Sequence, residues 1–408
     1  MHSSSHERLT MRLTPAAELD HRCSRLRSRM IEKGLDAVII VQNADLFYFT
    51  GTVQSGNLYV PADGEPLYLV RKDVGRARME CGLKEVISFS SMKDIPRIIS
   101  EYGYPMPRRI GLELDCLPVN FYEKYRSVFP AAEFSDATPL IRLVRMIKSH
   151  YELHLFQDAA DQVDKVHRRA KEVIREGMTD LELAAELEMT ARKEGHQGFL
   201  RMRAFNAELF YAHIFSGSDT AVPAYVDTPL GGMGVSTAFG QGAGYKRIER
   251  NEPIIVDFAG CFDGYMVDQT RIFAIGGISD RLKKAYEDML KVQERMIELA
   301  GELPSWGTIY EECHAMANGM GYGDFFMGNK GAQVSFIGHG IGIEIDEYPF
   351  IARGFNDMYL EPGMVFAFEP KAVFAGEGAV GIENTFFVTE NGVRQLTISD
   401  QELVILPA

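Results

Sequence analysis

Two aspartates, Asp257 and Asp268, lie in neighbouring apolar segments that are joined by the dipeptide Asp263-Gly264. An Asp-Gly pair between two apolar segments is a strong signal for a β-hairpin with a two-residue turn. In the register that this turn predicts, Asp257 lies opposite Thr270, and Asp268 is its diagonal neighbour on the same face of the ribbon. Two carboxylates on one apolar face repel each other unless a cation lies between them. The hairpin therefore predicts a site for divalent cations.

Three later residues offer further metal ligands. His339 lies in the glycine-rich segment 338–342, Glu369 ends an apolar strand, and Glu383 lies within the apolar segment 380–387. Singly, His339 fits a buried structural histidine and Glu369 fits a surface acid. Together with the two aspartates, the glutamates give four negative charges, which two divalent ions would balance in a buried site. Carboxylate oxygens with one imidazole favour Mn(II) and also suit Co(II), Fe(II) or Zn(II).

The order and spacing of these segments resemble the pita-bread metallopeptidases, which include methionine aminopeptidase, Xaa-Pro aminopeptidase, prolidase and creatinase. The resemblance rests on V-D-F-A-G, G-Y-M-V-D-Q-T-R, G-H-G-I-G, E-P-G-M-V-F-A-F-E-P and G-I-E-N-T-F-F-V-T-E-N-G. It implies a two-metal site in which Asp257 binds one ion and Asp268 and Glu383 bridge both. His339 and Glu369 would complete the coordination of the other ion. The presence of all five ligands distinguishes the chain from creatinase, which is the metal-free member of the family.

The chain departs from the family's peptidases at two histidines that help to bind substrate. One of them usually follows a proline upstream of the first metal aspartate, where this chain has Ala224 or Gly240, depending on the alignment. The other precedes a Glu-x-Pro motif after G-H-G-I-G, where this chain has Asp346. Many Xaa-Pro peptidases also carry an arginine two residues before the last glutamate, where this chain has Gly381. These departures predict that substrate binding differs from that of ordinary peptidases of the family.

Two residues are candidates to replace the missing histidines. His213 is the histidine that lies shortly upstream of Pro223, and it could reach the same cavity, although a histidine among aromatic residues is also typical of a core. Asp346 could act as a general base, and it could equally pair with a cation or cap a turn. Three residues of the hairpin could orient the aspartates or could be ordinary strand residues: Tyr265, Gln269 and Thr270.

Three functional hypotheses follow from these residues. The leading one is a dinuclear metallohydrolase, an Xaa-Pro aminopeptidase or dipeptidase, in which Glu369 moves a proton from the attacking water to the leaving nitrogen. The second keeps the metals and makes the protein a lyase, or an enzyme that cleaves non-peptide C–N or C–S bonds, with Asp346 as the base. The third is a non-catalytic metal-binding homologue.

The elements that position these residues fall into two predicted domains. Residues 1–147 alternate between helix-like segments, such as 18–34, and strand-like segments, such as 36–41, which is typical of a compact α/β domain. This part resembles the creatinase-type amino-terminal domain. Residues 148–408 predict an α+β domain, the pita-bread domain that the resemblance implies.

Capping signals and apolar periodicity place four helices in the second domain. The predicted starts and ranges are Ser149 with Glu152, Thr179 with Glu182, 280–300, and Thr308 with Glu311. The predicted strands are 253–273, which contains the hairpin, 364–369 and 381–389.

The composition limits the partners of the protein. The chain has 408 residues and a formal net charge of −14, which disfavours binding to nucleic acid and to anionic membranes. No segment approaches the roughly 20 apolar residues of a membrane span, and the first residues lack the apolar run of a signal peptide. Five scattered cysteines without C-x-x-C spacing predict reduced thiols. We expect a cytoplasmic homodimer that acts on a short peptide or another small molecule.

Overall fold

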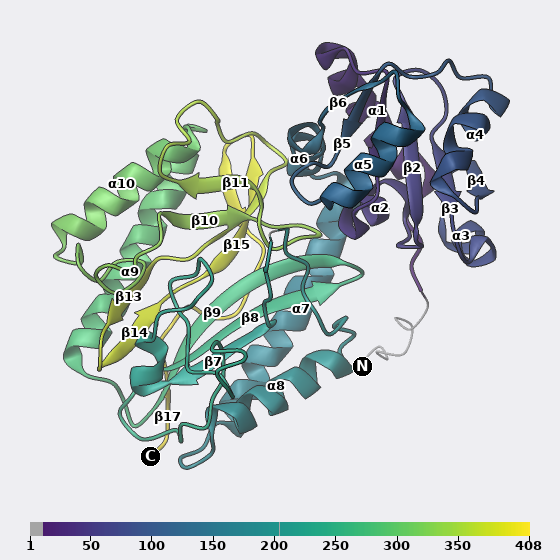
Figure 1. Ribbon diagram of the computed structural model, residues 1–408. Helices are drawn as coiled ribbons and strands as arrows, with labels where there is room; N and C mark the ends of the chain where they lie inside the picture. The colour runs from purple at the N-terminus through teal and green to yellow at the C-terminus, as the bar shows by residue number, and fades with distance from the viewer. Residues whose placement is uncertain (1–10, 204) are drawn as a thin grey trace, which may run out of the picture. The chain divides into compact units, whose positions relative to one another are not determined.

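The computed structural model describes residues 11–203 and 205–408 of the chain (Figure 1). It divides into two compact units, of which the first ends at Val144 and the second begins at Arg145. The division falls within the helix α6 (Thr138–Met146). None of the helices in these described ranges is long and apolar enough to cross a bilayer.

The first unit is built around a six-stranded mixed sheet with the strand order β4-β3-β2-β1-β5-β6. Its strands are β1 (Ala37–Ile40), β2 (Gly56–Pro61), β3 (Leu67–Val70), β4 (Glu85–Ser88), β5 (Arg109–Leu112) and β6 (Glu133–Asp136). Its other helices are α1 (Ala16–Lys33), α2 (Asn43–Thr50), α3 (Val74–Glu80), α4 (Ile95–Glu101) and α5 (Val119–Val128), with the 3-10 turn η2 (Met92–Asp94). The strands β1, β2 and β3 form an antiparallel meander, whereas β4, β5 and β6 pair in parallel with their neighbours. The predicted α/β class of this domain is confirmed.

Four helices of the second unit surround its sheets: α7 (His150–Val173), α8 (Asp180–Lys193), α9 (Asp280–Ala300) and α10 (Trp306–Gly319). The capping boxes predicted at Ser149 and Thr179 are confirmed, because each hydroxyl accepts from the backbone N–H three residues later. The predicted cap at Thr308 is wrong. The hydroxyl of Ser305 caps α10 by accepting from the Thr308 N–H, so the helix begins one turn earlier.

Three sheets make up the rest of the second unit. The first has the order β17-β9-β8-β7, the second has the order β11-β10-β12-β15-β16, and β13 with β14 forms a two-stranded ribbon. The strands of the first sheet are β7 (Ala212–Ser216), β8 (Ile254–Phe262), β9 (Tyr265–Ile275) and β17 (Val404–Leu406), and the turn η3 (Gly217–Ala221) follows β7. Those of the second are β10 (Phe336–Gly340), β11 (Glu347–Ala352), β12 (Val365–Phe368), β15 (Asn384–Thr389) and β16 (Gly392–Gln395). The ribbon consists of β13 (Lys371–Phe374) and β14 (Gly378–Gly381).

The hairpin of β8 and β9 has the predicted register. Asp257 pairs with Thr270, and the turn consists of Asp263 and Gly264. Their φ angles of 47° and 87° are both left-handed, as a primed two-residue turn requires. Asp268 therefore lies diagonally across from Asp257 on the same face.

The predicted strand 381–389 is interrupted in the structure. β14 pairs with β13, β15 pairs with β12, and the chain changes sheets at Ile382 and Glu383. A second change of sheet occurs at Glu369 and Pro370, between β12 and β13. Both glutamates thus lie where the chain leaves one sheet for another, so neither residue belongs to the regular face of a strand.

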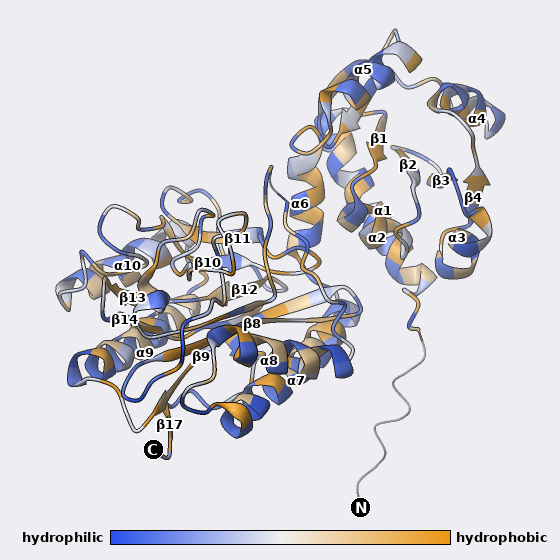
Figure 2. Ribbon diagram, turned by 60° about the horizontal axis from the view of Figure 1, so that its bottom comes forward, coloured by the Kyte–Doolittle hydropathy of each residue, from blue (hydrophilic) through white to orange (hydrophobic). Residues whose placement is uncertain are grey.

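Apolar residues hold the hairpin against the helices. The strands β8 and β9 are coloured mainly as hydrophobic, whereas α7, α8 and α9 carry both hydrophobic and hydrophilic residues (Figure 2). A stripe of apolar residues on α7 packs towards β8 and β9. It comprises Phe156, Ala159, Ala160, Val163, Val166, Ala170 and Val173, which are all buried. The hairpin that carries both aspartates is therefore held in place by its packing against α7.

Candidate metal centre

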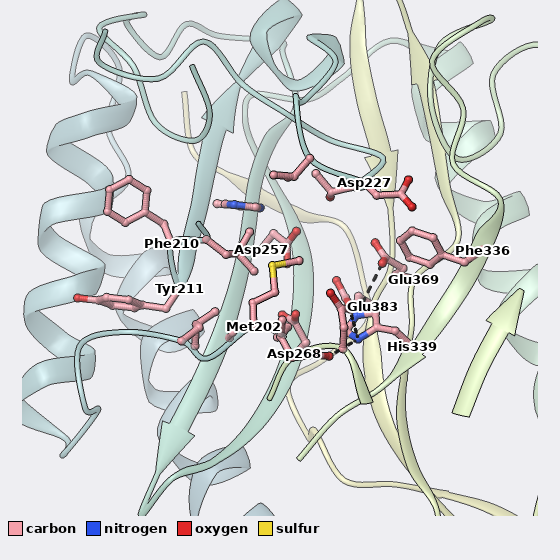
Figure 3. Close-up of a pocket in the computed structure, with 18 residues that line it drawn as sticks. Met202, Phe210, Tyr211, Asp227, Asp257, Asp268, Phe336, His339, Glu369 and Glu383 are labelled. Atoms are coloured by element: carbon pink, nitrogen blue, oxygen red, sulfur yellow. Dashed lines mark hydrogen bonds and ion pairs between the residues drawn. The ribbon is translucent and has the colours of Figure 1, made fainter. Parts of the chain in front are cut away.

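The five predicted metal ligands line one pocket. Asp257 and Asp268 come from the strands β8 and β9, and they approach the pocket from one side (Figure 3). His339 on β10, Glu369 after β12 and Glu383 before β15 approach from the other side (Figure 3). The pocket therefore lies between the two larger sheets, and residues more than 100 positions apart meet in it.

Three of these residues form a compact group of ligand atoms. One ligand atom each from Asp268, His339 and Glu383 lies within 4.8 Å of the others. The Nδ1 atom of His339 lies 2.7 Å from the carbonyl oxygen of Ile345, to which it can donate. That bond leaves Nε2 with its lone pair directed towards the carboxylates, which is the tautomer of a metal-binding imidazole. This donor set fits one divalent ion.

A buried lysine, Lys371, lies among three of the carboxylates. The Nζ atom of Lys371 lies 2.6 Å from Oε2 of Glu369, 3.0 Å from Oε2 of Glu383 and 3.6 Å from Oδ2 of Asp257. The lysine is only 1% exposed. Sequence reasoning missed this residue, although a lysine in the apolar segment Pro370-Lys-Ala-Val-Phe374 is a signal, because a lysine is rarely buried unless it is paired.

The pKa values of Asp268 and Asp257 shift in opposite directions. Burial raises the pKa of Asp268 well above its ordinary value, and the negative charges of Glu383 and Asp257 add to this effect. Burial acts in the same direction on Asp257, but the nearby Lys371 ammonium outweighs it and holds the pKa of that carboxyl below its ordinary value. Asp257 is therefore already balanced by a cation of the protein, whereas Asp268 would gain most from an added cation.

Neighbouring side chains support the cluster to different extents. The hydroxyl of Thr270 donates to Oε2 of Glu383 at 2.7 Å. The hydroxyl of Thr385 accepts from the backbone N–H of Asp268 at 2.8 Å. Of the other two candidates from the hairpin, Tyr265 donates to Glu152, and the side-chain amide of Gln269 donates to Ser399. The backbone N–H of Gln269 donates to Oδ1 of Asp268 at 3.0 Å. Thr270 and Gln269 thus both bond to a proposed ligand, Thr270 through its side chain and Gln269 through its backbone.

His213 lies in the same pocket. It is opposite Asp257 in the pairing of β7 with β8, and it is buried. Its Nε2 atom lies 2.8 Å from the side-chain nitrogen of Gln241, which is also buried. Burial lowers the pKa of His213 below its ordinary value, so the imidazole is neutral at physiological pH.

Asp346 also lines the pocket. Its Oδ1 atom lies 3.6 Å from Nδ1 of His339, and its side chain is 33% exposed. The two other positions that align with a family histidine lie apart from the pocket lining: Ala224 is half-buried in the loop after η3, and Gly240 is exposed. The structure therefore brings His213 and Asp346 to the candidate ligands, but not Ala224 or Gly240.

The remaining walls of the pocket are mostly apolar. They include Leu200, Met202, Leu209, Phe210, Tyr211 and Phe336. Phe210 and Tyr211 stand on the side of the pocket away from His339 (Figure 3). A cluster of charged groups at one end and aromatic walls at the other are typical of a site for a small substrate.

Comparisons with known proteins agree with this arrangement. The family described as metallopeptidase family M24 matches residues 154–390, and the creatinase/prolidase N-terminal domain matches residues 22–147. The Xaa-Pro dipeptidase of Pyrococcus furiosus is 28% identical over 392 residues, which cover 95% of this chain and 100% of the relative. The solved prolidase from Pyrococcus horikoshii OT3 matches with a TM-score of 0.79 at 25% identity, covering 94% of this chain and 100% of its own. The X-Pro aminopeptidase from Thermotoga maritima MSB8 matches with a TM-score of 0.77 at 25% identity, covering 93% and 99%. The predicted fold class, a creatinase-type domain followed by a pita-bread domain, is confirmed.

Proposed function

Because the chain belongs to metallopeptidase family M24, we propose that it is a metal-dependent hydrolase of short peptides with proline in the second position. The observation that carries this proposal is the convergence of Asp268, His339 and Glu383 in a pocket with aromatic walls. The names of its relatives support the substrate class, since several are Xaa-Pro dipeptidases.

The residues of the pocket have distinct roles in this reaction. Asp268, His339 and Glu383 would hold a divalent ion, which lowers the pKa of water and polarises a substrate carbonyl. Glu369 lines the pocket beside them and is placed to accept the proton of the attacking water and return it to the leaving nitrogen. His213 is neutral and offers a hydrogen bond to the peptide in place of a family histidine.

The walls of the pocket suit a proline-containing peptide. Met202 and Phe210 provide apolar surface in the same pocket as the carboxylates, against which a pyrrolidine ring can pack. Position 381 is a glycine, where many Xaa-Pro peptidases have an arginine. We therefore propose that the carboxylate of the peptide contributes less to binding than it does in those enzymes.

Removal and return of metal test this proposal. Dialysis against a chelator is expected to abolish the cleavage of an Xaa-Pro dipeptide, because only the ion activates the water, and Mn(II) is expected to restore it. A dipeptide of the same residues in reverse order, with proline first, serves as the control and is expected to be cleaved at least about tenfold more slowly. Cleavage that is unaffected by the chelator, or equal for the two peptides, would contradict the proposal.

A second candidate function is favoured by the place of Asp346. Its partly exposed carboxylate faces the pocket beside His339, where a base could remove a proton from a bound substrate. The protein would then be a lyase or would cleave a non-peptide C–N or C–S bond.

The variant Asp346→Asn distinguishes the two functions, because an amide keeps the shape of the carboxyl but cannot accept the proton. If the protein is an Xaa-Pro peptidase, the variant is expected to lose less than about tenfold in peptide cleavage, since Glu369 handles the proton. If Asp346 is the base, turnover of the best non-peptide substrate falls by about 100-fold or more while the metal content stays unchanged. The measurement is both turnovers on both proteins, together with elemental analysis.

A further inference from the structure

We propose that the Lys371 ammonium takes the place of the second metal ion, so that the chain binds a single divalent ion at Asp268, His339 and Glu383. This inference rests on the proposed function, because it concerns the cations of the same site. It revises the two-ion arrangement that the family resemblance implies.

The two oxygens of each glutamate face different cations. The Oε1 atoms of Glu369 and Glu383 each lie 3.9 Å from Nε2 of His339, on the side of the converging ligand group. Their Oε2 atoms lie 2.6 and 3.0 Å from Nζ of Lys371. Both carboxylates therefore bridge the His339 side of the site and the ammonium, in the way that carboxylates bridge two metal ions.

An ion and the ammonium cannot both occupy the Lys371 side. Carboxylate oxygens bind a transition-metal ion at about 2.0–2.2 Å, so an ion there would have to lie between the oxygens of Asp257, Glu369 and Glu383. The Nζ atom already lies among those oxygens, and the lysine is only 1% exposed. The two positive charges would also repel each other in this buried place.

Gly381 lies directly across the ribbon of β13 and β14 from Lys371. A Cβ atom at position 381 would lie 2.5 Å from the carbonyl oxygen of Pro370, 2.6 Å from Cγ of Lys371 and 2.8 Å from its Cα, which is closer than atoms can approach. The backbone that carries Lys371 to the carboxylates therefore leaves room only for glycine at position 381, and an arginine there is incompatible with this course of the chain.

The charges of the site are consistent with one ion. The four carboxylates carry four negative charges, of which Lys371 neutralises one and a divalent ion neutralises two. The remaining negative charge would complement the amino-terminal ammonium of a bound peptide. A second ion is therefore not needed to bury the group.

Metal stoichiometry of the full chain tests the inference. Wild-type protein is stripped with a chelator, dialysed, and titrated with Mn(II), and bound metal is measured by elemental analysis. Saturation is expected at about one ion per chain, where a dinuclear site would take about two. The EPR spectrum at saturation is expected to show the resolved hyperfine structure of an isolated Mn(II) ion, and a spectrum broadened by coupling between two ions would overturn the inference.

A variant of the lysine provides the converse test. Lys371→Met keeps the unbranched apolar stem of the side chain and removes the ammonium, so the stoichiometry is expected to rise to about two ions per chain. The matched control is Lys246→Met, because Lys246 is partly buried but pairs with Glu252, outside the pocket lining. The control is expected to bind about one ion, as the wild type does. A folded Lys371→Met variant that still binds one ion would overturn the inference, and if this variant does not fold, the wild-type titration and spectrum decide alone.

Failure of this inference is distinguishable from failure of the proposed function. A wild-type protein that binds two ions and cleaves Xaa-Pro peptides would overturn the role of Lys371 and leave the function standing. A protein that binds one ion and cleaves none of these peptides would support the role of Lys371 and overturn the function.

Discussion

Replacing Asp268 with alanine is expected to weaken metal binding by at least about 100-fold, because the loss of a partner that only supports a ligand already costs 10–100-fold. Asp268 is one of the three residues whose ligand atoms converge. Without it, the ion loses one of its three converging ligands and is no longer held from the strand β9. Elemental analysis after dialysis is expected to find little bound metal, and peptide cleavage is expected to fall in proportion.

The matched control for this variant is Glu287→Ala. Glu287 is an exposed carboxylate on α9 in the same unit of the chain, outside the pocket lining. This control removes one negative charge without touching the site, so its metal content and activity are expected to equal those of the wild type. Unchanged metal content in the Asp268→Ala variant would contradict the proposed metal site.

The parts of the site that depend on local geometry could be predicted from the sequence. The turn at Asp263 and Gly264 sets the register of the hairpin, and a register error of one residue would put the two aspartates on opposite faces of the ribbon. The observed pairing of Asp257 with Thr270 agrees with the prediction. Local turn chemistry was therefore sufficient to place two carboxylates side by side.

The residues that the prediction missed depend on how distant segments cross. Lys371 reaches three carboxylates because the chain changes sheets at Pro370 and because a glycine at position 381 lets the backbone of Pro370 and Lys371 pass close to it. Neither condition is visible in the period-two pattern of an isolated strand. The other change of sheet, at Ile382 and Glu383, interrupts the predicted strand 381–389, since the apolar pattern continues through Ile382 although the strand partner changes.

Irregular segments and competing caps account for the other differences. Met202 and Phe210 lie between α8 and β7, outside the helices and strands of the described residues, so no periodicity points to them. Thr308 has the glutamate three residues later that a capping box requires, whereas Ser305 lacks it and caps α10 through its hydroxyl alone.

Glu347→Gln is expected to destabilise the second unit by about 3–5 kcal/mol at neutral pH, the cost of leaving buried charges without their partner. Glu347 is buried at the start of β11 and accepts hydrogen bonds from Arg145 and Lys148, which are buried as well. It also accepts from the backbone N–H groups of Ile343 and Glu344. These bonds hold the loop whose Ile345 carbonyl orients His339, so metal affinity is expected to fall together with stability.

The pH dependence of this loss follows from the direction of the pKa shift of Glu347. Burial alone would raise the pKa, but the charges and hydrogen bonds of Arg145 and Lys148 outweigh it and lower the pKa of Glu347 to about 2. An unfolded glutamate has a pKa of about 4.3. The folded value is the lower one, so the charged form stabilises the folded state above the unfolded pKa, and this contribution is lost as the pH falls through the folded value.

Urea unfolding of the wild type and Glu347→Gln over a series of pH values measures this contribution, because the other carboxylates are common to both proteins and cancel in the difference. The difference in unfolding free energy is expected to be constant above about pH 5 and to shrink as the pH falls from about 4.5 towards 2. A glutamine cannot titrate, so the whole change belongs to the wild-type carboxylate. A difference that stays constant down to the lowest pH at which both proteins fold would show that Glu347 acts through its shape and not through its charge, and the buried ion pairs would then not be what holds the His339 loop.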